Sequence, residues 1–349
     1  MQGSSPLVSG SPKGLHDDHF AIVVVLLLCC SGCASIPTRK PDQPQGAVAA
    51  APAVIWRDPG EMASLNLFYG AGGQEHAPDL NGTFTFIKED LQATSPKFDV
   101  RDGRGVEWKV KLDEEPQSET AATRFLWAAG YFVDEDYYLA ELKLAGAPAA
   151  LRRGRKFISS DGTVHQARLE RKSHDVKKVG PWDWFNNPFV ETREFDGLRT
   201  MVSFLNDWDL KAVNNAVYEV PGERRYVVSD IGATFGRTGS FHSGSQSSPR
   251  DYAASRFIST TTPEFVDFEM RTRPFFLLAV SLPEYIRRSR MQGIARRIPR
   301  PHAQWVGHRL GMLSPAQIHD AFRAAGYNPD EIDAFTQVVL KRIAALDAL

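Results

Sequence analysis

Carboxylate, ammonium and amide side chains gather in one short run of the chain, NDWDLKAVNN, at residues 206–215. The run contains Asp209, Lys211 and Asn214, and Asp230 follows it in the sequence Ser-Asp-Ile-Gly. A carboxylate can accept a proton from a reacting hydroxyl, and carboxylate and amide oxygens bind hard cations such as Mg²⁺. Each of these residues taken singly is also common in turns and caps, so it is their order along the chain that favours a chemical role.

Two short strands are predicted between Asn214 and Asp230. Residues 216–220 and 225–229 are rich in apolar and β-branched side chains, and they flank the turn Pro221-Gly222-Glu223. This pattern is typical of a hairpin. Because a hairpin returns the chain to the place where it began, we expect Asn214 and Asp230 to lie close together.

The segments before this run predict a small sheet that carries one helix. Three alternating segments are expected to form an antiparallel start, the latter two joined by the turn at residues 102–105, and Pro116 then opens a helix that Gly130 ends. Helices are expected after Gly180 and in most of the chain after Pro263. The predicted strands are residues 83–87, 97–101, 106–112, 137–144 and 163–172, and the clearest later helix is residues 195–205, with further helix starts at Ser314-Pro315 and Asn328-Pro329.

The run at residues 206–215 and the later Asp-x-Gly resemble the catalytic loop and the metal-binding triplet of protein kinases. The resemblance implies an α+β, bilobal protein-kinase-like fold, with a small antiparallel β-sheet N-lobe carrying one helix and a mainly helical C-lobe. It also implies Mg²⁺ and ATP as cofactors. In that scheme Asp209 accepts the proton of the acceptor, Lys211 lies beside the transferred phosphoryl group, and the metal ligands are Asn214 and Asp230.

The family also uses a lysine on a strand and a glutamate on the following helix to hold the nucleotide. Lys109 and Lys111 lie on the same face of one predicted strand, so periodicity cannot choose between them. We prefer Lys111 because it comes at the end of the strand, as in the family's V-A-I-K. Glu119, near the start of the helix, is the candidate partner, although only eight positions separate it from Lys111.

Three parts of the family pattern differ in this chain. No G-x-G-x-x-G joins the first two strands, and residues 89–96 read EDLQATSP, so other backbone N–H groups or Ser95 are the candidates for holding the phosphates. Asp207-Trp208 replaces the His-Arg of the catalytic loop, which leaves a phosphorylated activation segment without an obvious partner. Residues 237–250 are rich in Ser, Gly and His and lack the A-P-E motif.

The N-terminus has the pattern of an export signal. Residues 20–30 form an unbroken apolar run, and Ser31-Gly32-Cys33 follows. This resembles the lipobox of bacterial lipoproteins and implies lipidation of Cys33; the alternatives are a buried apolar helix or a transmembrane anchor. We expect a signal peptide at residues 1–33, a flexible tether at 34–60, an N-lobe at 61–174 and a C-lobe at 175–349. The expected location is the bacterial cell envelope, with the outer membrane or periplasmic face favoured because Ala34 is not aspartate.

Composition narrows the possible functions. All three cysteines fall between residues 29 and 33, which excludes a disulfide framework or thiolate metal site in the body. The formal net charge is −1, and no basic stretch interleaves with aromatic residues, so no nucleic-acid partner is expected. We predict an ATP- and Mg-dependent phosphotransferase, tethered to the membrane, that acts on an unknown hydroxyl acceptor. The alternatives are a pseudokinase-like binding lipoprotein without turnover and a nucleotidyl transferase.

Overall fold

The computed structural model describes residues 51–92, 95–173, 175–237, 245–270 and 276–349. The predicted signal peptide, Cys33 and most of the predicted tether lie outside these described residues. Within the described ranges, no helix is both long enough and apolar enough to cross a membrane.

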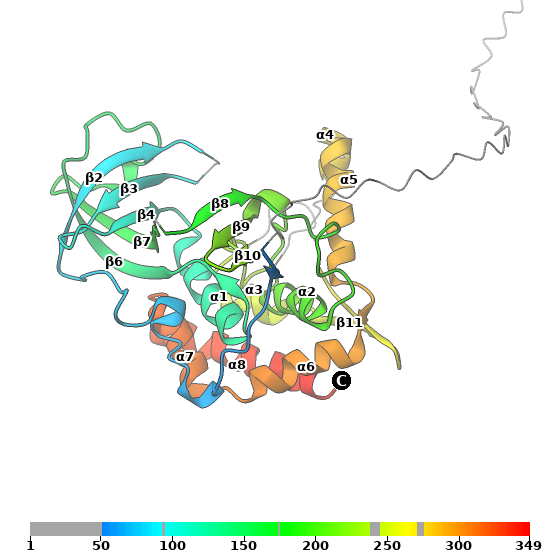
Figure 1. The fold of residues 1–349 in the computed structure, drawn as a ribbon. Coiled ribbons are helices and arrows are strands. Elements are labelled where there is room, and N and C mark those ends of the chain that lie inside the picture. Colours follow the sequence, from blue (N-terminus) through cyan, green and yellow to red (C-terminus); the bar gives the residue numbers. More distant parts are fainter. Residues whose placement is uncertain (1–50, 93–94, 174, 238–244, 271–275) are drawn as a thin grey trace, which may run out of the picture. The chain divides into compact units, whose positions relative to one another are not determined.

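Five strands close into a barrel (Figure 1). All neighbouring pairs are antiparallel except β2 with β6, which is parallel and closes the barrel. The five predicted strands are therefore present, but closure of the sheet was not predicted, because the closing pair joins segments far apart in sequence. In barrel order the strands are β2 (Thr83–Asp90), β3 (Lys97–Arg101), β4 (Glu107–Lys111), β7 (Thr163–Arg171) and β6 (Asp136–Ala145).

The turn between β3 and β4 sets the register of these two strands. The carboxylate of Asp102 accepts hydrogen bonds from the backbone N–H groups of Arg104 and Val106, both at 2.9 Å, and from the indole of Trp108 at 3.1 Å. Because these bonds fix the length of the turn, Lys97 lies directly opposite Lys111. Both lysines therefore project from the same face of the barrel.

Helix α1 (Pro116–Ala128) follows the barrel's third strand and packs against β6, β7 and α7 (Pro315–Ala324). It begins with a proline at its first position, where no backbone N–H is needed. It ends before Gly130, whose φ of 100° belongs to the left-handed region that glycine tolerates. The helix was predicted from these two signals and is confirmed.

A second sheet surrounds the predicted hairpin, which is present as β9 (Asn215–Val220) and β10 (Glu223–Val228). Strands β8 (Lys177–Gly180), β5 (Phe132–Val133) and β1 (Ala53–Val54) join it. Strand β1 lies inside the range predicted as a tether, and Ile55 after it is buried. The folded part of the chain therefore begins before residue 60.

The rest of the described chain is mostly helical, as predicted, but it contains a three-stranded sheet, β11-β12-β13, that was not predicted. Its strands are short, and β13 pairs with a segment some thirty residues earlier, so local patterns do not reveal it. The starts of α7 and α8 are confirmed, since Ser314 and Asn328 both form capping boxes. The remaining elements are α2 (Arg193–Leu205), α3 (Pro249–Ala254), β11 (Ile258–Thr261), β12 (Phe265–Phe268), α4 (Phe276–Val280), α5 (Leu282–Met291), β13 (Ile298–Pro299), α6 (Arg300–Gly311), α8 (Pro329–Asp347) and the short 3₁₀ turns Met62–Ser64, Gly70–Gly72, Arg155–Phe157, Ala212–Asn214 and Gln292–Ala295.

The buried apolar side chains form two clusters. One fills the barrel and includes Phe98, Val110 and Leu169. The other is larger and joins α1 to α2, α6, α7 and α8. Helix α1 contributes to the second cluster while it packs against strands of the barrel, so its position relates the two parts.

Candidate functional site

Lys111 ends strand β4 and lies beneath helix α1. Its neighbours Val110 and Leu112 belong to the apolar interior of the barrel, so alternation along the strand directs Lys111 to the outer face. Its side chain is only 1% exposed. The ammonium nitrogen lies 2.7 Å from Oε2 of Glu119 and 2.8 Å from Oδ1 of Asp230, and it also contacts the carboxylate of Glu115.

Lys109 occupies a different environment on the same face. Its ammonium nitrogen lies 3.5 Å from Oε1 of Glu170, and its side chain is 31% exposed. The structure therefore brings Lys111, and not Lys109, to Glu119 and Asp230. The choice that periodicity left open is thus made by the fold, and the short spacing of eight residues does form the ion pair.

Lys111 and the carboxylates around it stabilise one another in their charged forms. Burial alone would lower the pKa of Lys111, but the carboxylates of Glu119, Asp230 and Glu115 outweigh burial and raise it. Burial would likewise raise the pKa of Asp230, yet Lys111 holds it below its ordinary value. Both groups are therefore charged at neutral pH.

Arg168 on β7 is a second cation beside Glu119. Its Nε lies 3.4 Å from Oε2 of Glu119, and its two Nη atoms pair with Asp136 and Glu170. Arg168 is paired with Lys111 in the register of β4 and β7, which places it in this cluster. No local sequence pattern indicated a role for Arg168, because its pairing with Lys111 depends on how the barrel closes.

The predicted catalytic loop is held by its own side chains. Helix α2 ends at Asn206, whose φ of 57° turns the chain away. Oδ2 of Asp209 accepts a hydrogen bond from Nζ of Lys211 at 2.7 Å. The amide nitrogen of Asn214 donates to the carbonyl of Asp209 at 2.7 Å and to Oδ2 of Asp209 at 3.3 Å. The carboxylate of Asp209 is 24% exposed, so it remains open to a substrate.

The hairpin brings Asp230 back to this loop. The backbone N–H groups of Ser229 and Asp230 both donate to the carbonyl of Asn214, at 3.2 and 3.0 Å. Asn215 is paired with Val228 at the base of the hairpin. The expected closeness of Asn214 and Asp230 is therefore observed, and Asp230 links the loop of Asp209 to the ion cluster of Lys111.

Asp207 stands at one of the positions where this chain departs from the kinase pattern. Its side chain is buried, and burial raises its pKa well above the ordinary value for aspartate. Its Oδ1 accepts a hydrogen bond from the backbone N–H of Asp209 at 3.1 Å. Asp207 therefore positions the backbone at Asp209 instead of presenting a cation to the chain.

Ser95 and Lys97 lie at the same end of the barrel. Oγ of Ser95 donates to Oε2 of Glu115 at 3.3 Å, so the predicted phosphate contact is near the ion cluster. Burial, and then the charge of Lys111, lower the pKa of Lys97. Lys97 was not among the predicted site residues, although the predicted turn at residues 102–105 would have placed it opposite Lys111.

The oxygen ligands available here fit a hard cation. Oxygens of Glu115, Glu119 and Asp230 lie within 4.8 Å of one another, but the ammonium of Lys111 already bonds to all three residues. Asn214 uses its amide nitrogen for Asp209 and keeps its oxygen, and Asp230 uses Oδ1 for Lys111 and is 37% exposed. Asn214 and Asp230 therefore supply the kind of ligand that Mg²⁺ prefers.

Comparisons with known proteins find likeness only at the level of structure. No protein-family model matches the chain, and no curated protein matches it by sequence. The Helicobacter pylori proinflammatory kinase CtkA matches with a TM-score of 0.43 and 9% identity, over 76% of this chain and 97% of that one. Golgi casein kinase with Mn/ADP bound matches with a TM-score of 0.39 and 8% identity, over 76% of this chain and 73% of that one. A second structure of the Golgi casein kinase matches with a TM-score of 0.30 and 8% identity, over 74% of each chain.

A buried strand lysine pairs with a glutamate of the next helix, and the Asp230 that it also bonds adjoins Asn214 of the loop at the base of a hairpin. The structure therefore brings together the lysine, glutamate, aspartate and asparagine of the motifs that resemble those of protein kinases.

Proposed function

We propose that the chain is an ATP- and Mg²⁺-dependent phosphotransferase that transfers the terminal phosphoryl group of ATP to a hydroxyl-bearing acceptor. One observation carries this proposal. The ion cluster of Lys111, Glu119 and Asp230 and the hydrogen-bonded loop of Asp209 and Asn214 meet through the backbone bond from Asp230 to Asn214. Phosphoryl transfer needs this combination of cations, metal ligands and a carboxylate, and little else from the protein.

In the proposed reaction the acceptor oxygen forms a bond to the γ-phosphorus while the bond from that phosphorus to the bridging oxygen of ADP breaks. Asp209 takes the proton of the acceptor hydroxyl, and ADP leaves with the electron pair of the broken bond. Lys211, 2.7 Å from Oδ2 of Asp209, compensates charge on the transferred group. Lys111, held by Glu119, binds the other phosphates.

The metal ligands in this scheme are Asn214 and Asp230. Bound there, Mg²⁺ would neutralise negative charge on the phosphates. The proposal includes the bilobal arrangement, with lobes at residues 61–174 and 175–349 and the nucleotide between them, because the ion cluster lies where the barrel meets the α2–β9 loop and the hairpin.

The test uses two variants of the full chain and one control. We expect Asp230→Ala to abolish Mg-dependent ATP binding measured by calorimetry. Asp209→Ala should keep binding but lower turnover by roughly 100-fold to 10,000-fold, the range for a positioned base. Asp333→Ala, an exposed aspartate on α8, should change neither quantity. Unchanged ATP binding in the Asp230→Ala variant would rule out the assigned metal ligand.

A binding role without turnover is the second candidate, and one observation favours it. The ammonium of Lys111 is already surrounded by three carboxylates, so phosphates must compete with them. The intact mass of an acceptor after incubation with ATP distinguishes the three hypotheses. Phosphotransfer adds a phosphoryl group, nucleotidyl transfer adds a nucleotidyl group, and a scaffold leaves the acceptor unchanged.

We further propose that the protein is a lipoprotein of the bacterial cell envelope, anchored through Cys33 at the outer membrane or periplasmic face. The support is the apolar run at residues 20–30 and the Ser-Gly-Cys that follows. Labelling with palmitate should mark the wild-type chain and should be lost in the Cys33→Ser variant. Equal labelling of both chains would contradict this anchor.

A further inference from the structure

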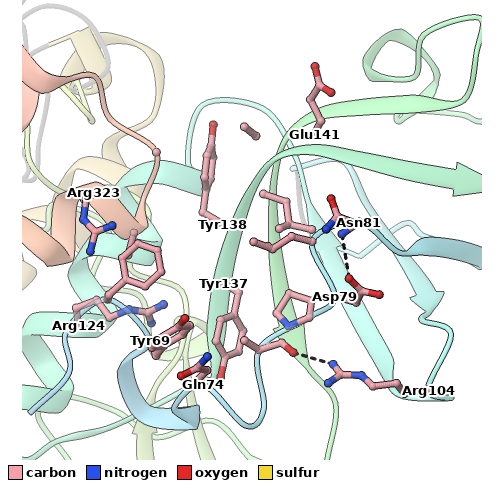
Figure 2. Close-up of a pocket in the computed structure, with 18 residues that line it drawn as sticks. Tyr69, Gln74, Asp79, Asn81, Arg104, Arg124, Tyr137, Tyr138, Glu141 and Arg323 are labelled. Atoms are coloured by element: carbon pink, nitrogen blue, oxygen red, sulfur yellow. Dashed lines mark hydrogen bonds between the residues drawn. The ribbon is translucent and has the colours of Figure 1, made fainter.

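A cavity of about 640 Å³ lies on the barrel, outside the candidate site (Figure 2). It is bounded by residues 68–81, by the first half of β6 and by the end of α7 around Arg323. It contains none of the residues assigned to the nucleotide, the metal or the catalytic loop. Its volume falls in the range of small-molecule sites in proteins, about 300–1,000 Å³.

Arg124 of helix α1 lines this cavity and is only 2% exposed. One of its nitrogens, Nη2, donates to the backbone carbonyl of Asp136 at 2.6 Å. Nη1 has only a long contact, 3.4 Å, with the hydroxyl of Thr123, and Nε has no hydrogen-bond partner among the described residues. Within that same part of the chain, no carboxylate forms an ion pair with Arg124.

A buried guanidinium without a carboxylate is costly, because burial removes water without supplying a negative charge. Burial lowers the pKa of Arg124 to about 10, and the nearby Asp136 only partly offsets this effect. The carboxylate of Asp136 itself pairs with Arg168. Among the charged side chains that line this cavity and belong to the described residues, Arg124 and Asp79 have no ion pair, and of these two only Arg124 is buried.

The position of Arg124 is built into the surrounding chain. Gly70 has a φ of 70°, and a Cβ at this position would come within 2.7 Å of Cδ and Cζ of Arg124. Only glycine leaves room for the arginine side chain there. The guanidinium also lies over the ring of Tyr137, with its carbon 5.7 Å from the ring centre.

Aromatic rings form one part of the cavity wall, and the polar part includes the exposed carboxylates of Asp79 and Glu141. Phe68 and Tyr69 meet edge to face with ring centres 5.0 Å apart, and Tyr138 lines the cavity from β6. Arg323 lies over the ring of Phe68 at 4.3 Å, but it is paired with Asp320. A ligand that fits must therefore bring a planar apolar part for these rings and a negative charge for Arg124.

We propose that this cavity binds a small organic anion, with a carboxylate or phosphate group that pairs with Arg124 and a flat apolar part that packs against the tyrosine rings. The site is independent of the proposed phosphotransfer, since it shares no residue with it. Arg124 binds the anion directly, and Arg323 adds a weaker attraction at the rim.

The test compares a charged probe with its neutral isostere on the full chain. Calorimetry with phenylacetate should show saturable binding, and phenylacetamide should bind at least about ten-fold more weakly, because it cannot form the charge-assisted bond to Arg124. In Arg124→Gln the preference for the acid should disappear. Arg101→Gln, an exposed arginine paired with Glu107, should keep it.

A second variant keeps the test decisive if Arg124→Gln does not fold. Ala140 is an exposed residue that lines the cavity from β6, so Ala140→Trp should fill the space without touching the core. We expect this variant to unfold at the same temperature as the wild type and to lose phenylacetate binding. Equal affinity of the wild type for the acid and the amide, retention of binding in both variants, or no saturable binding at millimolar concentration would overturn the proposal.

Discussion

Two buried cations lie at helix α1, and their charges are balanced in different ways. Lys111, just before the helix, bonds to Glu119 and Asp230 and also contacts Glu115. Arg124, near the end of the helix, bonds to a backbone carbonyl and has no ion-pair partner among the described residues. Both side chains are at most 2% exposed, so the contrast lies in the negative charge around them. The chain itself supplies the negative charge beside Lys111, whereas in our proposal a ligand supplies the negative charge beside Arg124.

The largest expected effect comes from removing each cation in turn. Lys111→Met leaves three carboxylates without their shared partner, and we expect a loss of about 3 kcal/mol in the free energy of unfolding. The loss should lie at the lower end of the range for a broken buried pair, because Arg168 still contacts Glu119. Arg124→Met removes an unbalanced charge and one hydrogen bond, so its cost should be about 1 kcal/mol or less.

Urea unfolding of both variants, followed by tryptophan fluorescence in a buffer without organic anions, measures this difference. The two substitutions are matched, since each replaces a long cation by methionine beside the same helix. An equal loss in both variants would show that the two cations are balanced alike, and the contrast between the two regions would then fail.

The two regions also differ in how much of each could be predicted from the sequence. Lys111, Glu119 and Asp230 were predicted from the resemblance to the kinase motifs, and the strand, the helix and the hairpin that position them each have a local signal. Lys97–Arg101 was predicted with its observed bounds from such a local signal. The fold places all of the predicted nucleotide, metal and catalytic residues in or beside one cluster, while Cys33 lies outside the described residues.

The parts of the fold and the site that were not predicted depend on contacts between segments far apart in the sequence. Arg168 enters the site only because β4 pairs with β7, and the barrel closes only because β2 pairs with β6. Neither pairing leaves a pattern in neighbouring residues. Arg124 has no sequence signal at all, since its lack of a partner is a property of the packed structure and of Gly70 beneath it.

Two carboxylates, Asp230 and Asp134, differ in the same way as the two cations, because one has an opposite charge beside it and the other has a like charge. The smallest of the expected effects comes from this pair. Asp230 lies beside Lys111, which lowers its pKa. Asp134, between β5 and β6, lines a cavity of about 450 Å³ together with Glu170. Burial, and then the charge of Glu170, raise the pKa of Asp134 to about 7, although Ser229, Arg168 and Lys109 act against this rise.

The sign of the resulting pH dependence follows from proton binding. The pKa of Asp134 is 3.8 in the ordinary case and about 7 in the folded chain. At pH values between these two, the folded chain holds the Asp134 proton more tightly than the unfolded chain does. The stability that this proton contributes is present at low pH and is lost as the pH rises through about 7. Asp134→Asn has no such proton to lose, so it should become more stable than the wild type as the pH rises from about 5 to about 8.

Asp161→Asn is the matched control, because Asp161 is exposed and its pKa is lowered to about 2, below this window. Thermal unfolding at several pH values measures both differences, and a gap between Asp134→Asn and the wild type that stays constant with pH would place Asp134 with the balanced carboxylates such as Asp230.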